Sequence, residues 1–392
     1  MINGGGALLD GYATRAELSS VDPDPLEVPH GLVAAVRHRA PDRGDRDRWF
    51  HRRRHRRGRL GATPQPCGRS RPTAASTPAV THRRHAAVRR AGTRASDYRG
   101  RVAAFTVLFC ADPLSPHRVD PYFAGQAALV RDLGGAIALV DHDAILAGNA
   151  IAATRRVPAD LGPVWYRGWM IPADRYAELA AVLAAHGTPL RVEPDDYRAA
   201  HELPGWYATF AAVTPATVWT PRKPFDPLPA DEVADLVQPL GDGPGIVKDY
   251  VKSRKHEWTE ACFLPDLADA GHAARVIARL IELQEDTLQG GIVVRRFEDF
   301  GRAAGRTAEA RVWWVDAEPA LVSAHPDTPE QAPRPDLRAI TPLVAALGGR
   351  FVTTDMALRA DGEWRVVEVG DGQVSDLPPT ADAALLFSAL AR

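Results

Sequence analysis

From Val102 onward, short apolar runs alternate with amphipathic stretches that end in glycine, and this alternation limits the folds open to the chain. Short apolar runs bounded by polar residues are typical of buried strands. Three runs of this kind are VAAFTVLFC, AIALV and PVWYRGWM. Helices are expected between them, at about 121–133 and from Pro172 to about His186. Strands that alternate with helices predict an open, mostly parallel α/β sheet.

The second half of the chain has a different pattern. The segment TPATVWTPRKPFDPLP (214–229) is rich in proline, and we interpret it as a linker. A long amphipathic helix is expected at about 269–288. Further on, RFVTTDMAL and EWRVVEVG flank Asp361-Gly362, which is a strong signal for a two-residue hairpin turn. Antiparallel pairs of this kind predict an α+β fold for this half.

Residues 1–100 differ from the rest of the chain in charge. They hold 20 arginines and 9 acidic residues, whereas the other residues hold 28 basic and 40 acidic groups. Few apolar residues recur there at a helix or strand period, so we expect a disordered, arginine-rich extension. The chain then divides into the extension at 1–100, an α/β domain at 101–222 and an α+β domain at 223–392. The acidic balance of the two domains argues against nucleic acid as the main partner.

The cysteines and the hydropathy pattern bear on the compartment. Cys67, Cys110 and Cys262 stand far apart, which gives neither a disulfide framework nor zinc spacing and favours a reducing cytoplasm. No run of eighteen uncharged apolar residues occurs, so we expect no membrane span. The first residues lack a basic segment followed by an apolar run, so we expect no secretory signal.

A cluster of lysines is the strongest local clue to function. The chain has 44 arginines and four lysines, and three of those lysines are Lys248, Lys252 and Lys255. On a strand at 246–252, Lys248 and Lys252 would share one face. A compact ammonium group suits a phosphate oxygen that is met as a point charge. The alternative is a solvated edge strand, in which lysines are common.

Two carboxylates in the last hairpin predict a metal site. Asp355 and Glu368 each lie between apolar neighbours, and a buried carboxylate is costly unless a cation meets it. Mg²⁺ bound to nucleotide phosphates takes one or two such carboxylates. Because two carboxylates crowd each other, removing one is expected to leave the ligand-free fold nearly unchanged. The alternative for Asp355 and Glu368 is that they face outward on a half-exposed hairpin. Asp371 and Gln373 follow on a loop that we expect to be flexible and able to complete the metal shell.

A further strand, EARVWWVD, places Glu309 and Arg311 on one face. An arginine directed at a transferring phosphoryl group stabilises the charge that develops there. A surface ion pair between the two side chains is the bland alternative.

Aromatic and basic residues gather at YRGWM and HELPGWY in the first domain. Clusters of this kind line substrate pockets, and they equally serve as packing between domains. The candidate substrate contacts in these two segments are Arg167, Trp169, Trp206 and Tyr207.

Taken in order, these segments resemble an ATP-grasp domain, and VKDYVKSRKHEW, YRGWM and VVEVGDGQVSDLP are similar to the R-two-K clade of that superfamily. The resemblance covers roughly 102–392. It implies that ATP lies between the two halves of the grasp, with Lys248 or Lys252 on its phosphates. It also implies that the adenine contacts the backbone near Val294, Arg295 and Arg296 and that Glu298 binds the ribose. Mg²⁺ would be held by Asp355, Glu368 and Asp371, and Arg311 would face the acyl phosphate. One departure is Gly370, which stands where many ATP-grasp enzymes have a metal-binding asparagine.

The resemblance also implies an activity. ATP-grasp enzymes phosphorylate a carboxylate and let an amine attack the acyl phosphate, which yields an amide, ADP and phosphate. We therefore expect an ATP- and Mg²⁺-dependent carboxylate–amine ligase whose amine belongs to a small molecule or a peptide. A kinase on the same fold and a non-catalytic nucleotide-binding module are the alternatives.

Overall fold

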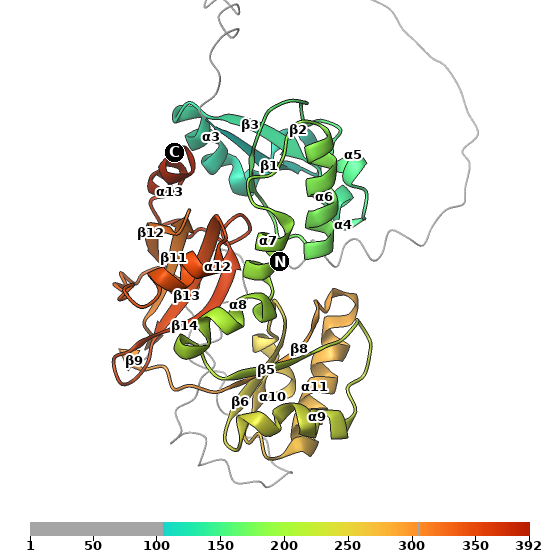
Figure 1. The fold of residues 1–392 in the computed structure, drawn as a ribbon, viewed down its shortest axis with the longest axis vertical. Coiled ribbons are helices and arrows are strands. Elements are labelled where there is room, and N and C mark those ends of the chain that lie inside the picture. The colour runs from blue at the N-terminus through green and yellow to red at the C-terminus, as the bar shows by residue number, and fades with distance from the viewer. Residues whose placement is uncertain (1–104, 304–305) are drawn as a thin grey trace, which may run out of the picture. The chain divides into compact units, whose positions relative to one another are not determined.

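The computed structural model describes residues 105–303 and 306–392. These described residues belong to one compact unit, and the predicted extension at 1–100 lies outside them. Within this unit an α/β region is followed by antiparallel sheets with helices (Figure 1), so the predicted fold class is confirmed. The boundary predicted at residue 222 stays a prediction.

The first sheet is built around β1 (Thr106–Asp112), which pairs in parallel with β3 (Ala136–Val140) and β4 (Trp165–Arg167). All three strands were predicted. After β1 the chain returns as the antiparallel strand β2 (Ser115–Val119), which was not predicted. This strand is half exposed and mostly polar, which explains why its sequence carries no strand signal.

Helices cover this sheet and lead away from it. The predicted helices at about 121–133 and after Pro172 are present, although the former begins as a 3₁₀ turn. Four short helices were missed, because runs of five to eight residues are too short for a clear period. The helices of this region are η2 (Pro121–Phe123), α3 (Ala124–Asp132), α4 (His142–Leu146), α5 (Ala150–Thr154), α6 (Ala173–Ala185), α7 (Pro194–His201), α8 (Leu203–Phe210) and η3 (Ala211–Val213).

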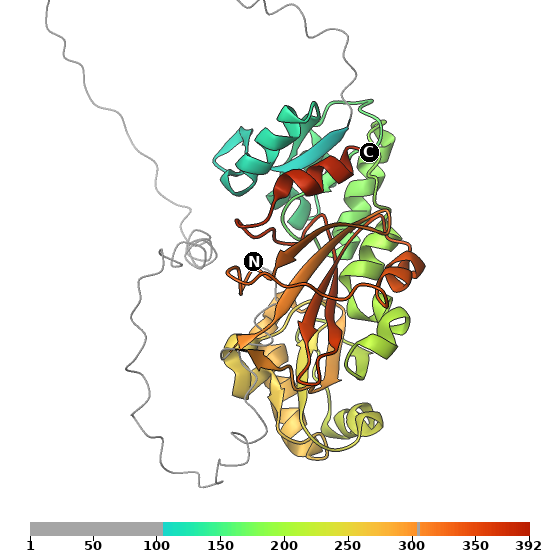
Figure 2. The ribbon, with the colours of Figure 1, turned by 90° about the vertical axis from the view of Figure 1, so that its left-hand side faces the viewer.

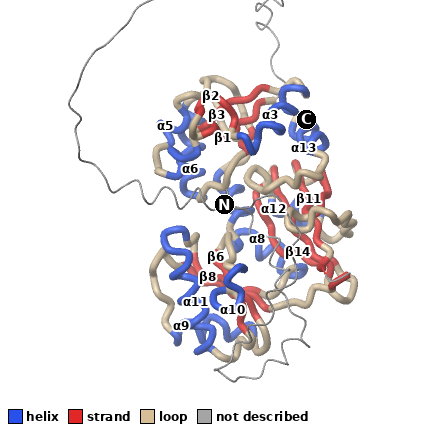
Figure 3. Tube along the Cα trace, turned by 180° about the vertical axis from the view of Figure 1, so that it is seen from behind, coloured by secondary structure: helices blue, strands red, loops and turns tan. Residues whose placement is uncertain are grey.

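The second sheet has the order β5-β8-β6-β7 and is antiparallel throughout. Figure 3 shows two of its strands, β6 and β8, in red. Its strands are β5 (Thr217–Pro221), β6 (Gly245–Asp249), β7 (Phe263–Leu264) and β8 (Gly291–Arg296). The proline-rich segment 214–229 is therefore not simply a linker, because its first part forms edge strand β5 and proline is tolerated at an edge. Gly291 allows a close approach there, since a Cβ at this residue would lie 2.2 Å from the carbonyl oxygen of Thr220.

Helices on one side of the second sheet supply a separate core. The predicted long helix is α11, which ends at Gln284 and continues only as a 3₁₀ turn. Its apolar face packs against α9 and the sheet through Val276, Ile277 and Leu280. The helices are α9 (Ala230–Val237), η4 (Gln238–Leu240), η5 (Lys255–Glu257), α10 (Trp258–Ala261), α11 (Ala270–Gln284) and η6 (Glu285–Thr287).

The third sheet has the order β12-β11-β13-β14 and carries the predicted last hairpin. Its strands are β11 (Glu309–Val315), β12 (Glu318–Ala324), β13 (Phe351–Leu358) and β14 (Trp364–Asp371). The hairpin turn is longer than predicted, since Arg359 N–H donates to Glu363 O, and Gly362 has a φ of +91° within it. A bulge between Asp355 and Met356 offsets this difference, so that Asp355 still lies opposite Glu368. The ribbon of β9 (Arg302–Ala303) and β10 (Arg306–Thr307) precedes β11 in the chain, and the helix α12 (Thr341–Leu347) precedes β13.

The last helix, α13 (Ala383–Leu390), completes the core of the first sheet. Figure 2 shows it beside α3, and its side chains Leu386 and Phe387 are fully buried in that core. The indole Nε1 of Trp165 donates a 2.9 Å hydrogen bond to the carbonyl oxygen of Leu390.

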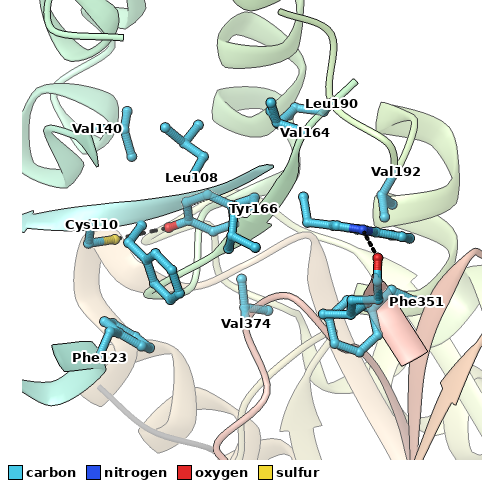
Figure 4. Close-up of a cluster of buried hydrophobic side chains, with 14 of the residues drawn as sticks. Leu108, Cys110, Phe123, Val140, Val164, Tyr166, Leu190, Val192, Phe351 and Val374 are labelled. Atoms are coloured by element: carbon cyan, nitrogen blue, oxygen red, sulfur yellow. Dashed lines mark hydrogen bonds between the residues drawn. The ribbon is translucent and has the colours of Figure 1, made fainter. Parts of the chain in front are cut away.

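Tyr166 lies in the middle of the same core. Its hydroxyl is 3.2 Å from Cys110 Sγ, and Leu108 and Val374 lie on either side (Figure 4). The core of the α/β region is therefore built partly from residues near the end of the chain.

Candidate functional site

Three charged side chains form a row across the third sheet. Arg311 on β11 lies opposite Asp355 on β13, which lies opposite Glu368 on β14. Neighbouring residues in register point to the same face, so the three side chains project together. Sequence patterns placed each of them on its strand, and the sheet order brings them together.

Arg311 and Asp355 form a buried bidentate ion pair. Arg311 Nε and Nη2 donate to the two Asp355 carboxylate oxygens at 2.7 Å each, and the residues are 3% and 7% exposed. Burial alone would raise the pKa of Asp355, but the charges of Arg311 and then His325 outweigh it and hold the pKa below its usual range. Arg311 therefore already has a counter-ion when no ligand is present.

Glu368 is paired with the first predicted lysine. Lys248 Nζ lies 3.0 Å from Glu368 Oε1, and the Lys248 side chain is 2% exposed. Lys248 comes from β6 of the second sheet, so this ion pair joins that sheet to the third one. The alternative of a solvated edge strand fails for Lys248, which is buried.

Lys252 lies beyond the strand that was predicted to carry it. The strand β6 ends at Asp249, whose Oδ1 accepts hydrogen bonds from the backbone N–H groups of Val251 and Lys252. Burial lowers the pKa of Lys252, and the charge of Asp249 opposes this shift. Asp249 was not singled out from the sequence, although an aspartate often marks a turn because its side chain accepts from the backbone two residues on. The result is a partly buried ammonium group in a tight turn.

A histidine joins the Arg311–Asp355 pair. His325 Nε2 lies 3.5 Å from Asp355 Oδ2, and His325 Nδ1 lies 3.6 Å from Glu309 Oε2. The backbone N–H of Asp327 donates to His325 Nδ1 at 3.1 Å. No sequence pattern indicates this contact, because His325 follows β12 and its partners lie on other strands.

A pocket opens over this row of charges and encloses about 410 Å³, part of which is open to solvent. It is bounded by residues of the α/β region, of the turn after β6 and of the third sheet. These are Met170, His201, Val251, Arg311, Thr353, Asp355, Glu368, Val369, Gly370, Asp371, Val374 and Ser375. None of the four predicted substrate contacts is among them.

Those four residues serve packing in the structure. Arg167 is 1% exposed and donates to Gln126 and to the carbonyl oxygen of Gln373, and Trp169 Nε1 donates to Asp120. Trp206 is 1% exposed beneath the guanidinium of Arg295, and the Tyr207 hydroxyl accepts from the backbone N–H of Thr217. Of the two interpretations that the sequence left open, the geometry favours packing, and a substrate role stays a prediction.

The predicted nucleotide-binding segment has most of its polar groups engaged. β8 pairs with β5 on one side and with β6 on the other along Val294 and Arg295. The Arg295 guanidinium donates to Thr217 Oγ1, Thr214 Oγ1 and the carbonyl oxygen of Val367, and Arg296 binds the carbonyl oxygen of Leu240. Adenine and ribose contacts on this segment remain predictions.

Glu298, the predicted ribose ligand, is held by Arg365. The guanidinium donates to both Glu298 oxygens, at 3.0 and 2.9 Å. A ribose at Glu298 would have to share or displace this pair.

Asp371 and Gln373 do not lie on a flexible loop. Gln373 is fully buried; its Nε2 donates to the Tyr176 hydroxyl, its Oε1 accepts from Tyr166 N–H and its carbonyl accepts from Gly168 N–H. Asp371 Oδ1 accepts from the backbone and side chain of Gln373, and burial raises the pKa of Asp371 to about 7. The prediction of flexibility is wrong, because hydrogen bonds from Tyr166, Gly168 and Tyr176 of the α/β region hold Gln373 in place.

Asp355 and Glu368, the two carboxylates predicted to bind a metal, lie opposite each other on β13 and β14. Among the residues that the structure describes, no group of three or more His, Cys, Asp and Glu side chains is arranged to hold a metal ion. Two adjacent carboxylates do fit a Mg²⁺ ion that brings phosphate oxygens with it. In that case the ion would take the place that Arg311 and Lys248 hold beside them.

The sheets and helices of the described residues form an ATP-grasp fold. Residues 239–390 match the family model of the ATP-grasp domain, R-two-K clade family 3. No curated protein matches the sequence. A bilayer would need a longer and more apolar helix than any in the described part of the chain.

Several solved structures have similar folds at low sequence identity. D-cycloserine synthetase DcsG is 17% identical with a TM-score of 0.47, over 73% of this chain and 98% of that one. The ATP-grasp ligase PsnB, in complex with precursor peptide PsnA2 and AMPPNP, is 14% identical with a TM-score of 0.44, over 74% and 97%. A RimK domain ATP-grasp protein from Sphaerobacter thermophilus DSM 20745 is 16% identical with a TM-score of 0.44, over 69% and 92%.

Proposed function

We propose that this protein is an ATP- and Mg²⁺-dependent carboxylate–amine ligase that acts through an acyl phosphate. The observation that carries the proposal is the meeting of Lys248, Arg311, Asp355 and Glu368 beside one pocket, within a segment that matches an ATP-grasp family. The substrates would be ATP, a carboxylic acid and an amine of a small molecule or a peptide, and the setting would be the cytoplasm.

The chain's own cations would bind the phosphates. Lys248 and Lys252 carry compact ammonium groups; Lys248 is buried, and Lys252 is partly exposed with a pKa that burial lowers. Arg311 would stabilise the negative charge that develops on the phosphoryl group during its transfer. Because Lys248 and Arg311 are ion-paired in the absence of a ligand, binding would exchange their partners rather than create new charges in the site.

Asp355 and Glu368 would hold Mg²⁺ together with phosphate oxygens of the nucleotide. A bound Mg²⁺ ion supplies charge neutralisation and polarises the phosphoryl group. Asp371 is a weaker candidate, because Gln373 occupies one of its oxygens and its pKa of about 7 leaves it partly protonated at neutral pH.

The chemistry explains why these groups belong together. A carboxylate is a poor electrophile, and phosphorylation converts it into an acyl phosphate with a good leaving group. The amine then forms the C–N bond while the C–O bond to phosphate breaks and phosphate departs with the electron pair. A pocket with apolar walls at Val251, Val369 and Val374 would limit hydrolysis by water.

The test measures ADP release by the full chain while a panel of amino acids and short peptides is supplied as acids and amines. Mass spectrometry then identifies the products. Hydroxylamine should trap a hydroxamate if an acyl phosphate forms. A phosphorylated product that persists without any amine would contradict the ligase and favour a kinase. ATP binding without turnover under every condition would instead indicate a non-catalytic module.

A further inference from the structure

His201 is a buried side chain for which neither the fold nor the proposed ligase chemistry has yet given a role. It is the last residue of α7, which packs against β14, and it is 6% exposed. Its ring stacks on Tyr197 with centroids 5.0 Å apart, and Tyr197 stacks on Tyr176 at 3.9 Å. The Tyr197 hydroxyl donates a 2.6 Å hydrogen bond to the carbonyl oxygen of Ile171. The imidazole is therefore held at a fixed place in the pocket wall.

The polar side chains that line the pocket differ in whether they have partners. Arg311 is paired with Asp355 and Glu368 with Lys248, while Asp371 accepts from Gln373. The hydroxyl groups of Thr353 and Ser375 bind each other at 2.7 Å. His201 Nε2 is different: it is buried and has no hydrogen-bond partner among the residues that the structure describes. Buried polar atoms in folded proteins have partners as a rule, so this nitrogen points to a ligand.

The surroundings of His201 keep the imidazole neutral. Burial, then the charge of Lys252, then that of Lys248 lower the pKa of His201 to about 3. Tyr197 covers one face of the ring, and burial raises the pKa of its hydroxyl, so it carries no charge at neutral pH. A neutral imidazole has one nitrogen with a free lone pair, so His201 is able to accept a proton. The phosphates of a bound nucleotide would offset the charges of Lys252 and Lys248, which are the second and third causes of the lowered pKa after burial, and would so raise the pKa of His201.

We propose that His201 accepts the proton of the attacking amine through its unpaired ring nitrogen. The proposal rests on the proposed ligase function. The amine nitrogen forms the C–N bond, the acyl C–O bond breaks, and phosphate leaves with the electron pair. The proton released from the nitrogen passes to His201, and the imidazolium then returns it to water. His201 thus belongs to the second half-reaction and not to phosphorylation of the acid.

The experiment compares two nucleophiles in His201→Ala and His201→Gln, with the acid and amine found by the substrate panel. Hydroxylamine is largely unprotonated at neutral pH and is a strong nucleophile, so its attack needs no base. We expect amide formation to fall by about 100-fold or more, the usual size of general-base catalysis, while hydroxamate formation stays within about threefold of the wild type. Added imidazole should restore part of the amide formation in His201→Ala.

His142→Gln is the matched control, because His142 is also buried with a lowered pKa but its Nε2 is bonded to the carbonyl oxygen of Met170. It should leave the ratio of the two products unchanged. Equal loss of amide and hydroxamate in the His201 variants, or no loss of either, would overturn the assignment. Absence of hydroxamate with the wild-type protein would instead count against the ligase function itself.

Discussion

Replacing Glu368 by glutamine tests whether the ion pair between β6 and β14 holds the ligand-free protein together. Lys248 is 2% exposed and lies 3.0 Å from Glu368, which is 18% exposed. A glutamine keeps an acceptor oxygen but removes the charge. Hydrogen bonds to charged groups contribute about 1.5–3 kcal/mol and neutral ones about 0.5–1.5 kcal/mol, so a loss on the order of 1 kcal/mol is expected from the weaker bond. Complete loss of one partner from a buried pair costs about 3–5 kcal/mol, which sets the upper limit.

We therefore expect Glu368→Gln to lower the free energy of unfolding by about 1–3 kcal/mol, within these limits. Urea unfolding of the full chain measures this, and Glu363→Gln, an exposed glutamate in the hairpin turn, is the control that should change little. Lys248→Met and the double variant complete a double-mutant cycle that isolates the coupling. The same Glu368 variant should lose Mg²⁺-dependent ATP turnover. If Glu368→Gln proved as stable as the wild type or more stable, the ion pair would not contribute, and the expectation from two crowded carboxylates alone would be right.

Three further predictions concern charges in the same site. Lys252→Ala should weaken ATP binding by about 1.5–3 kcal/mol in calorimetry with little change in stability, whereas exposed Lys223→Ala should leave binding unchanged. The pKa of Asp371 is raised to about 7 in the folded protein, so its carboxyl destabilises the folded state increasingly as pH rises from about 4 to 7. Asp371→Asn should therefore raise the melting temperature at pH 8 and not at pH 4. The pKa of Asp355 is lowered by its partners, so its carboxylate stabilises the folded state above about pH 4 and this stabilisation is lost below it. The free energy of unfolding of Asp355→Asn should therefore depend less steeply on pH between about 4 and 2 than that of the wild type.

Local patterns were enough to predict the strands that carry the site. Alternation placed Arg311, Asp355 and Glu368 on their strands, and the hairpin signal at Asp361-Gly362 gave the pairing of the two carboxylates. That pairing is correct although the turn is longer than predicted, because the bulge after Asp355 restores the register. The composition of segment 214–229 misled the prediction, since its prolines indicate a linker, whereas β5 within it lies at a sheet edge that tolerates Pro221.

Contacts between distant segments were beyond the reach of the sequence. No spacing rule links Lys248 to Glu368, 120 residues later, or Glu298 to Arg365. The end of β6 at Asp249 depends on a side-chain hydrogen bond that competes with strand pairing, and strand periodicity does not detect this. His201 carries no motif; its significance comes from the missing partner at Nε2, which only packing defines.

The packing of α13 into the first core has a consequence for synthesis on the ribosome. The α/β region is translated long before residues 383–390, yet Leu386 and Phe387 fill its core and Leu390 accepts the hydrogen bond of Trp165. Until those residues emerge, the nascent α/β region must leave an apolar surface uncovered. Such surfaces promote aggregation and recruit chaperones. Ribosome-bound chains that stop before residue 383 should therefore be more sensitive to protease in the α/β region than chains that include α13.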